Sequence, residues 1–526
     1  MPAPRVALAA DLARPYNHAP MNHEQRASPP ERPPRQFSSA GSLAVVLLYA
    51  AAIYLPFLDG DSRTLTRHEV LISHPALQIL ENGDWVIPHY TGRPWVDKPP
   101  LITWVTAGLF ALLGGFNEVA ARLPAALSAI ALCLLLTAAT ARFYGNRAGL
   151  LAGLVQASCV YAYMQGRLGE IDMPFALLIA GAHAPLLWHW GKGEQRLSAL
   201  GAWTFHVMVG LAVLAKGPLG AILPVATVLC YCVFQRALWP LRAAFLTPAL
   251  LASVAIGLSW HVAVVVRLGG LGLERLWYTY FARAAGLHHL GSQSPLLYFY
   301  TVPWLVLPWG IVLLVGARSL ARDAWPRSAL RERLLWAWFF GGLAVLTLTA
   351  FKHKHYCIPI LPPLSILCGR LMALHVQQLG RQAQRLQFVA FIVALGAFTV
   401  VSGWIMPARD YRRETVAFVR EAVGAIPRDE PLSVVGLAQS AVYVYVPRPC
   451  SYADTPEELA AAARQARGPV WVLTTQENVE AGAQAGLAFE IERAEPARRK
   501  VPLPETLVLG RVVAAGTQPA TPAPAP

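Results

Sequence analysis

Residues 122–141 read RLPAALSAIALCLLLTAATA, a stretch in which the initial arginine is the single charged side chain. A membrane-spanning helix needs about 20 mainly apolar residues, and comparable stretches recur from Leu43 to Met406. Of the 526 residues, 55% are hydrophobic and 14% are charged, and the mean hydropathy is +0.42. This composition is too apolar for a soluble globular protein. The sequence therefore predicts a polytopic α-helical membrane protein.

The apolar stretches predict about eleven spans. The first is Leu43 to Leu58, and the others fall near 122–141, 149–166, 174–190, 199–215, 219–235, 244–266, 296–316, 334–350, 357–374 and 387–406. Leu101 to Gly115 is apolar but short, and counting it as a span would place the later arginine-rich loops outside. It is predicted to be a helix lying at the outer interface.

The arginines orient these spans. Five arginines lie between Arg5 and Arg35, before the first span, and the positive-inside rule places such segments in the cytoplasm. With this count, the other basic loops also lie inside: Arg142 and Arg147, Lys192 and Arg196, Arg236 and Arg242, Arg318 to Arg333, and Arg370 to Arg385. The prediction is a multi-pass protein of a bacterial inner (plasma) membrane, with a cytoplasmic N-terminus and a periplasmic C-terminal region.

Composition divides the chain into four parts. Residues 1–40 are rich in Pro and Arg and are predicted to form a disordered arm, residues 41–406 the transmembrane domain, and residues 407–516 a small extracytoplasmic α/β domain. In this last domain, strands are predicted at Leu432 to Leu437, Val470 to Leu473 and Leu507 to Val512, between helices such as 414–425 and 456–466. Residues 517–526 alternate Pro, Ala and Thr and are predicted to be disordered.

The formal net charge of +14 does not indicate a nucleic-acid partner. The basic residues are scattered among apolar segments and form neither a basic helix nor a zinc-binding pattern. Membrane lipids, the anionic ones in particular, are the predicted partners. The seven cysteines lack metal-ligand spacing and are interpreted as small apolar residues.

The charged residues that remain belong to predicted outer loops. An ionisable side chain at the edge of the hydrocarbon is costly and indicates function. Carboxylates in these loops suit glycosyl transfer, because an ionised carboxylate can act as the base that removes the proton of the acceptor hydroxyl. Glu69 and Asp172 are the candidates. If the donor is a lipid phosphate, the site also needs cations that bind the phosphate, and Lys98, Lys216 and Lys352 are suitable.

An ordered series of motifs resembles a known family. In the first outer loop these are His68-Glu69, Gly83-Asp84-Trp85, Asp97-Lys98-Pro99-Pro100 and Arg122-Leu123-Pro124. Arg167 with Asp172-Met173, Lys216-Gly217-Pro218, His289 with Pro295 and Tyr298, Pro308-Trp309 and Lys354-His355-Tyr356 follow. Over residues 43 to 375 the chain is similar to the C-type glycosyltransferases, and within them to aminoarabinose transferases and protein-mannosyltransferase-like enzymes.

The resemblance implies an active site at the outer membrane face and an undecaprenyl- or dolichyl-phosphate sugar as donor, with inversion at the anomeric carbon. The predicted donor phosphate-binding residues are Lys98, Lys216, Arg167, Lys352 and Tyr356. The acceptor is a glycolipid such as lipid A, a cell-wall polymer or a protein.

The chain departs from the family at the acidic pair of the first loop, which is usually Asp-Glu and here is His68-Glu69. Two interpretations follow: Glu69 is the catalytic base, which we favour at this point, or His68 is the base as a neutral imidazole. Asp172 matches the second acidic position, where it would orient the acceptor, support the base or hold a metal. The resemblance also implies a divalent metal bound by Asp97 with His288 or His289.

Two alternatives remain open. A secondary transporter or lipid flippase would show internal repeats and polar residues near the middle of the membrane, whereas the charges here lie at one face. The lost loop aspartate also permits an inactive scaffold.

Overall fold

The structure, a computed structural model, describes residues 38–287, 293–410, 412–437, 442–465, 469–484, 487–495 and 506–514. All of them belong to one unit, residues 37–526. His288 and His289, part of the predicted metal site, lie outside the described residues, as do the predicted arm up to residue 37 and the predicted tail.

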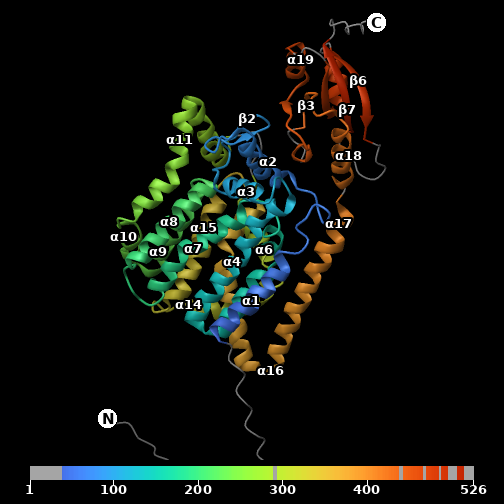
Figure 1. Cartoon of the computed structure of the whole chain (residues 1–526). Helices are drawn as coiled ribbons and strands as arrows, with labels where there is room; N and C mark the ends of the chain where they lie inside the picture. Colours follow the sequence, from blue (N-terminus) through green and yellow to red (C-terminus); the bar gives the residue numbers. More distant parts are fainter. Residues whose placement is uncertain are drawn as a thin grey trace, which may run out of the picture. The chain divides into compact units, whose positions relative to one another are not determined.

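The apolar part of the chain is a set of packed helices (Figure 1). They are α1 (Ser39–Tyr54), α2 (Arg67–Asn82), α3 (Leu101–Leu112), α4 (Glu118–Tyr144), α5 (Asn146–Ser158), α6 (Val160–Gln165), α7 (Asp172–Trp190), α8 (Ala199–Lys216), α9 (Leu219–Gln235), α10 (Trp239–Phe245), α11 (Leu250–Trp277), α12 (Arg283–Ala285), α13 (Leu297–Leu305), α14 (Gly310–Ala324), α15 (Leu330–Leu348), α16 (Pro362–Val400) and α17 (Met406–Arg409). Shorter pieces are the π-helical turns η1 (Tyr278–Ala282) and η3 (Val401–Ile405) and the 3-10 turn η2 (Lys354–Ile360).

Each predicted span coincides with one or two of these helices. Within the described residues, four helical stretches are long and apolar enough to cross a membrane, namely Glu118–Tyr144, Ala199–Lys216, Leu250–Ala282 and Pro362–Arg409. A fifth is added if α13 and α14, bent by 112°, form one span. The polytopic helical class is thus confirmed, and the count of about eleven crossings stays a prediction. The spans predicted at 357–374 and 387–406 share the helix α16, which breaks at Gly380 with a φ of 64°.

The sequence predicts a short helix over residues 70 to 81 of the predicted first outer loop, ended by Gly83, and α2 matches it. Thr66 caps its first turn by accepting from the Glu69 amide, while the Glu69 side chain accepts from the Thr66 amide, forming a capping box. Gly83 ends the helix in the left-handed conformation, at a φ of 73°. A short hairpin of β1 (His89–Tyr90) and β2 (Arg93–Pro94) then leads to α3.

The C-terminal segment has the predicted alternation of strands and helices. Its elements are α18 (Arg412–Gly424), β3 (Leu432–Val435), η4 (Tyr443–Tyr445), β4 (Ser451–Ala453), α19 (Pro456–Gln465), β5 (Val470–Thr475), α20 (Gln476–Gln484), β6 (Leu487–Ala494) and β7 (Leu507–Ala514). The strands form one sheet in the order β4-β3-β5-β7-β6. Strands β4, β3 and β5 are parallel, and β7 is antiparallel to β5 and β6. The predicted domain boundaries remain predictions.

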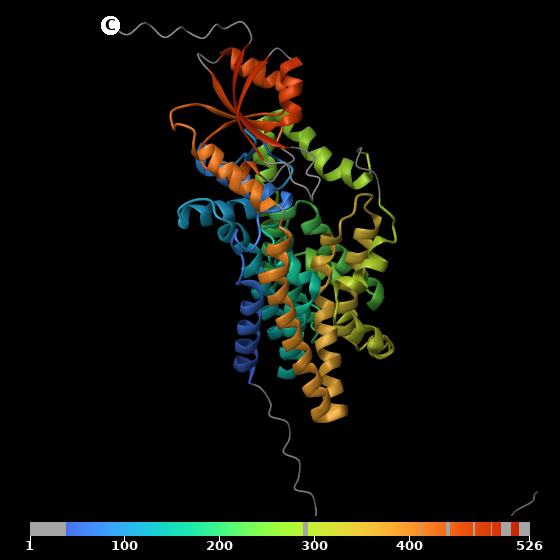
Figure 2. The same cartoon turned by 90° about the vertical axis from the view of Figure 1, so that its right-hand side faces the viewer.

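Two late segments of the chain, α16 and the C-terminal segment, pack against its beginning. Helix α16 returns alongside α1 (Figure 2), where the Tyr49 hydroxyl donates to the Phe391 carbonyl over 2.8 Å. The C-terminal segment shares a buried cluster with α2 and α3, and the Tyr445 hydroxyl accepts from the Leu65 amide at 2.7 Å. The C-terminal segment therefore packs against the loop before α2.

Candidate active site

Glu69 is completely buried at the start of α2 and fully occupied by hydrogen bonds. One carboxylate oxygen accepts from the Arg122 Nε at 2.7 Å and from the Gly169 amide at 3.0 Å. The other accepts from the Thr66 amide at 2.8 Å and lies 3.6 Å from an Arg63 nitrogen. Burial by itself would raise the pKa of this carboxyl, but Arg122 and Arg63 outweigh it and lower the pKa to about 2.

Arg122 extends the same network. It is 1% exposed, and besides Glu69 it donates to the carbonyls of Leu58, Asp59, Arg63 and Thr64. The Glu69–Arg122 centre thus holds the first outer loop against α4 and against the loop before α7. A carboxylate without solvent access cannot reach an acceptor hydroxyl. This geometry argues against Glu69 as the catalytic base and for a structural role.

Asp172 and Lys216 form a second buried pair. Asp172 begins α7, Lys216 ends α8, and the Lys216 amine donates to the Asp172 carboxylate. The same amine lies 4.7 Å above the Tyr356 ring, a cation–π distance. An ammonium has three donors, so the contact with Asp172 leaves capacity for a further anion.

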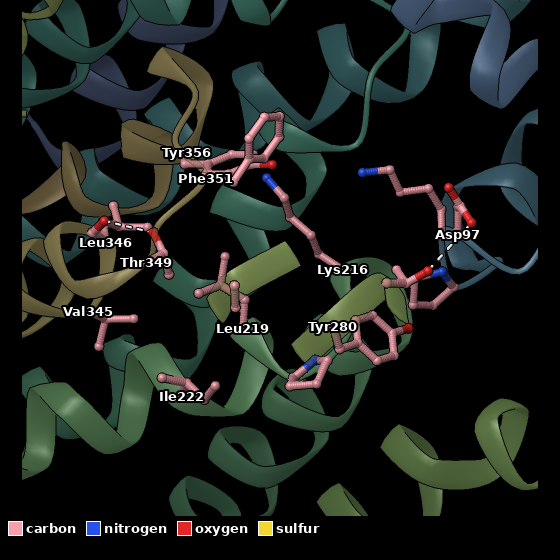
Figure 3. A pocket seen from close by; sticks show the side chains of 15 residues that line it. Asp97, Lys216, Leu219, Ile222, Tyr280, Val345, Leu346, Thr349, Phe351 and Tyr356 are labelled. Atoms are coloured by element: carbon pink, nitrogen blue, oxygen red, sulfur yellow. Dashed lines mark hydrogen bonds between the residues drawn. The ribbon is translucent and has the colours of Figure 1, made fainter. Parts of the chain in front are cut away.

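A cavity of about 190 Å³ opens beside this pair (Figure 3). Its polar lining comes from Asp97 and Lys98 before α3, Lys216 at the end of α8, and Thr279 and Tyr280 in η1. Tyr356 from η2 completes the wall, and Figure 3 shows the Lys216 amine directed toward it. The Thr279 hydroxyl donates to Asp97 over 3.4 Å. Four residues predicted from sequence, Asp97, Lys98, Lys216 and Tyr356, therefore meet at one place.

A larger apolar cavity of about 570 Å³ adjoins the first. It lies among α8, α9 and α11, and Pro218, Ile222 and Tyr280 line both cavities. Tyr280 is fixed at this boundary, because its hydroxyl is 3.0 Å from a His261 ring nitrogen and its ring packs directly on Gly217. A Cβ at Gly217 would stand 2.4 Å from the tyrosine ring, so only glycine fits there.

Three histidines gather beside Tyr356. The His353 and His355 rings stack at 4.9 Å, and the His68 ring lies 6.4 Å and 6.0 Å from them. His68 is exposed. Partial burial and the charges of Lys98 and Arg67 lower its pKa from the ordinary 6.5, against the pull of Asp172. The lowered pKa favours the neutral imidazole, and the side chain is accessible to solvent, as a base must be.

Two predicted phosphate ligands lie elsewhere. Arg167 is buried and donates to the carbonyls of Ile53, Pro56 and Phe57 at the end of α1. Lys352 is buried as well, and its amine donates to the carbonyls of Thr349 and Gln293. Both cations complete backbone hydrogen bonding, and neither lines the cavity. Their role as donor phosphate ligands stays a prediction, and this geometry favours a structural role for both.

The metal prediction gains no support from the described residues. Among them, no group of three His, Cys, Asp or Glu side chains is arranged to hold a metal ion. Asp97 lines the cavity, and its predicted partner His289 lies outside the described residues.

Sequence reasoning missed three features of the site. Thr279 and Tyr280 come from a π-helical turn, a feature that often marks functional sites but has no sequence signature. The sequence predicts His353 and His355 to be surface residues, whereas both are partly buried, and burial is the main cause that lowers the pKa of His355 to about 4. Arg122 was quoted only as part of a motif.

The fold is that of a known class of membrane enzymes. The crystal structure of ArnT from Cupriavidus metallidurans bound to undecaprenyl phosphate superposes with a TM-score of 0.70 at 19% identity, covering 91% of this chain and 100% of that chain. Its apo state gives a TM-score of 0.71 over the same shares. At this identity the likeness shows the fold alone.

Sequence comparisons agree with the fold. The family described as dolichyl-phosphate-mannose-protein mannosyltransferase matches residues 97–260. An undecaprenyl phosphate-alpha-4-amino-4-deoxy-L-arabinose arabinosyl transferase from Pseudomonas paraeruginosa is 28% identical over 58% of this chain and 55% of its own. One from Pseudomonas aeruginosa is 30% identical over 56% and 53%. The chain spans about half the length of these relatives. These matches support the predicted resemblance to the C-type membrane glycosyltransferases.

Proposed function

We propose that the protein transfers a sugar from a polyprenyl phosphate, undecaprenyl phosphate in particular, to an acceptor at the outer face of the inner membrane. The observation that carries this proposal is the junction of two cavities. The polar one presents Lys98 and Lys216, which suit a phosphate, and the apolar one suits an isoprenoid chain. Tyr280 lines both cavities, at the place where the phosphate headgroup of the donor would join its isoprenoid chain.

The proposed reaction is a single displacement. The acceptor oxygen attacks the anomeric carbon of the sugar, and its proton passes to the neutral imidazole of His68. The bond from the anomeric carbon to the phosphate oxygen breaks, and its electron pair stays on the phosphate. Lys98 and Lys216 offset this charge, while Asp172 holds Lys216 in place. One displacement inverts the anomeric carbon.

The outer-face location rests on the arginine distribution and on the ends of two helices. Helix α9 begins beside the candidate site, because Leu219 and Ile222 line the polar cavity, and it ends at the basic Arg236. Helix α15 begins with Arg331 and Arg333 and ends at the same cavity, which Val345 and Leu346 line. The basic ends are the ones expected in the cytoplasm, so the site belongs outside.

The names of the relatives indicate the sugar to test first. We propose 4-amino-4-deoxy-L-arabinose as the sugar and, as the acceptor, the glycolipid lipid A, which the family resemblance suggests. The purified protein should add the mass of one aminoarabinose to lipid A when supplied with the undecaprenyl-linked sugar. If neither this donor nor hexose-bearing donors support transfer, and undecaprenyl phosphate does not bind, the proposal is refuted.

A further inference from the structure

A third cavity lies far from the candidate site. It measures about 450 Å³ and is lined by side chains of α9, α14, α15 and α16 and by Trp325 directly after α14, and its lining includes Phe234, Ala321 and Arg333. Helix α9 contributes Leu219 to the polar cavity and Phe234 to this one. At 1.5 Å per residue these positions are about 22 Å apart. Figure 1 shows α14 at the end away from α2 and α3.

The walls of this third cavity suit a hydrocarbon chain. All of its lining side chains except that of Arg333 are apolar or aromatic. The neighbouring face of α14 is open, with Leu314 68% and Val315 75% exposed, as expected for a surface in contact with lipid. Trp325 is 85% exposed at the cavity rim, a residue type that gathers at membrane interfaces.

The rim of the third cavity carries uncompensated positive charge. Arg333 interacts electrostatically with Arg327 and Arg236, which are exposed and of like charge. Arg333 gives three donors to the carbonyls of Ala324, Phe234 and Trp325, and a guanidinium has five.

The carboxylates of Asp323 and Glu332, which lie near Arg327 and Arg333 in the sequence, already form ion pairs with another residue. Arg370 lies 2.9 Å from Asp323 and 3.5 Å from Glu332. Within the described part of the chain, no carboxylate forms an ion pair with Arg236, Arg327 or Arg333. Three guanidinium groups beside an apolar cavity need an anion that carries a hydrocarbon chain.

We infer that this third cavity binds an anionic phospholipid of the membrane, with an acyl chain between α14 and α15 and the phosphate at Arg327, Arg236 and Arg333. Basic pockets between helices on the cytoplasmic side of a membrane are known to select such headgroups. The inference is independent of the glycosyl-transfer proposal, since it concerns the opposite ends of α9 and α15.

The test compares two lipids and three variants of the full-length protein. Dioleoylphosphatidylglycerol or dioleoylphosphatidylcholine is added to the detergent-solubilised protein, and bound lipid is counted by native mass spectrometry alongside the melting temperature. The wild type should retain phosphatidylglycerol and melt higher with it. Replacing both Arg236→Gln and Arg327→Gln should weaken this binding roughly 30-fold, since each arginine near a membrane surface is worth about a factor of five.

The other variants test the effect of the arginine charges and the effect of the cavity volume separately. Ala321→Trp keeps the arginines but fills the cavity, and should abolish phosphatidylglycerol binding. The matched control, Arg381→Gln with Arg385→Gln, removes two exposed arginines of α16 and should bind like the wild type. Equal binding of both lipids by the wild type, or undiminished selectivity in the Arg236/Arg327 variant, would overturn the inference. So would an equal shift of the melting temperature with inorganic phosphate alone.

Discussion

Glu69–Arg122 and Asp172–Lys216 are both buried pairs of a carboxylate and a cation, and their surroundings differ. Around Glu69, both carboxylate oxygens and most of the Arg122 donors are bound within the protein. Among the described residues, Lys216 donates one hydrogen bond, to Asp172, and it lines a cavity. Charge and burial are shared, so they do not separate structure from chemistry. The two pairs differ in the number of hydrogen-bond donors that remain available to a ligand, and this number distinguishes a structural pair from one that can bind substrate.

The largest effect is expected at His68. Because general base catalysis typically contributes about 10²–10⁴-fold, His68→Asn should reduce the transfer rate by about that factor while the melting temperature stays unchanged. The measurement is transfer from a saturating lipid donor. His89→Asn, in the same loop but with its ring hydrogen-bonded to Asn82 at the end of α2, is the matched control and should be fully active. A fully active His68→Asn would return the role of base to a carboxylate.

Arg122→Ala should produce the next largest effect, on stability. It leaves Glu69 as an unpaired buried carboxylate, and breaking a buried pair in this way costs about 3–5 kcal/mol. Thermal unfolding in detergent measures the loss, and adding Glu69→Gln should restore part of it by removing the orphaned charge.

Lys216→Ala sharpens the comparison of the two pairs. It should cost less stability than Arg122→Ala, because Asp172 retains the favourable charge of Lys98. It should lower activity instead. Equal destabilisation by the two variants would show that the pairs play the same role.

A smaller effect is expected for Lys98→Ala. A hydrogen bond to a charged group is worth about 1.5–3 kcal/mol, so undecaprenyl phosphate should bind about 10- to 100-fold more weakly, as measured by titration. Lys192→Ala, an exposed lysine in the loop after α7, controls for the loss of charge. Unchanged affinity in Lys98→Ala would remove this residue from the site.

The sequence predicts those features of the fold that depend on a local pattern of residues. Gly83 as the end of α2, the apolar helices and the three central strands follow from periodicity and turn chemistry. The convergence of Lys98, Lys216 and Tyr356 followed from their placement in loops at one face. The hydrogen-bond partners of Glu69 could not be predicted in this way, because Arg122 and Gly169 lie 53 and 100 positions away from it in the sequence. Whether a buried carboxylate has capacity left depends on such distant partners, and no local pattern records them.

The smallest effect is a shift along the pH axis, and it separates His68 from Glu69 within one experiment. The pKa of His68 lies below 6.5, so transfer should fall at a pH below that value, as the imidazole gains a proton and stops accepting one. The pKa of Glu69 is lowered from 4.5 to about 2, so its contribution to stability is complete above pH 4.5 and is lost as the pH falls toward 2. Activity should therefore fail while the protein is still folded. With Glu69 as the base, activity would instead persist until the fold itself fails. Transfer and thermal unfolding, measured side by side from pH 8 downward, distinguish the two cases. Glu69→Gln adds the control: it should weaken the acid dependence of stability and leave the pH at which transfer falls unchanged.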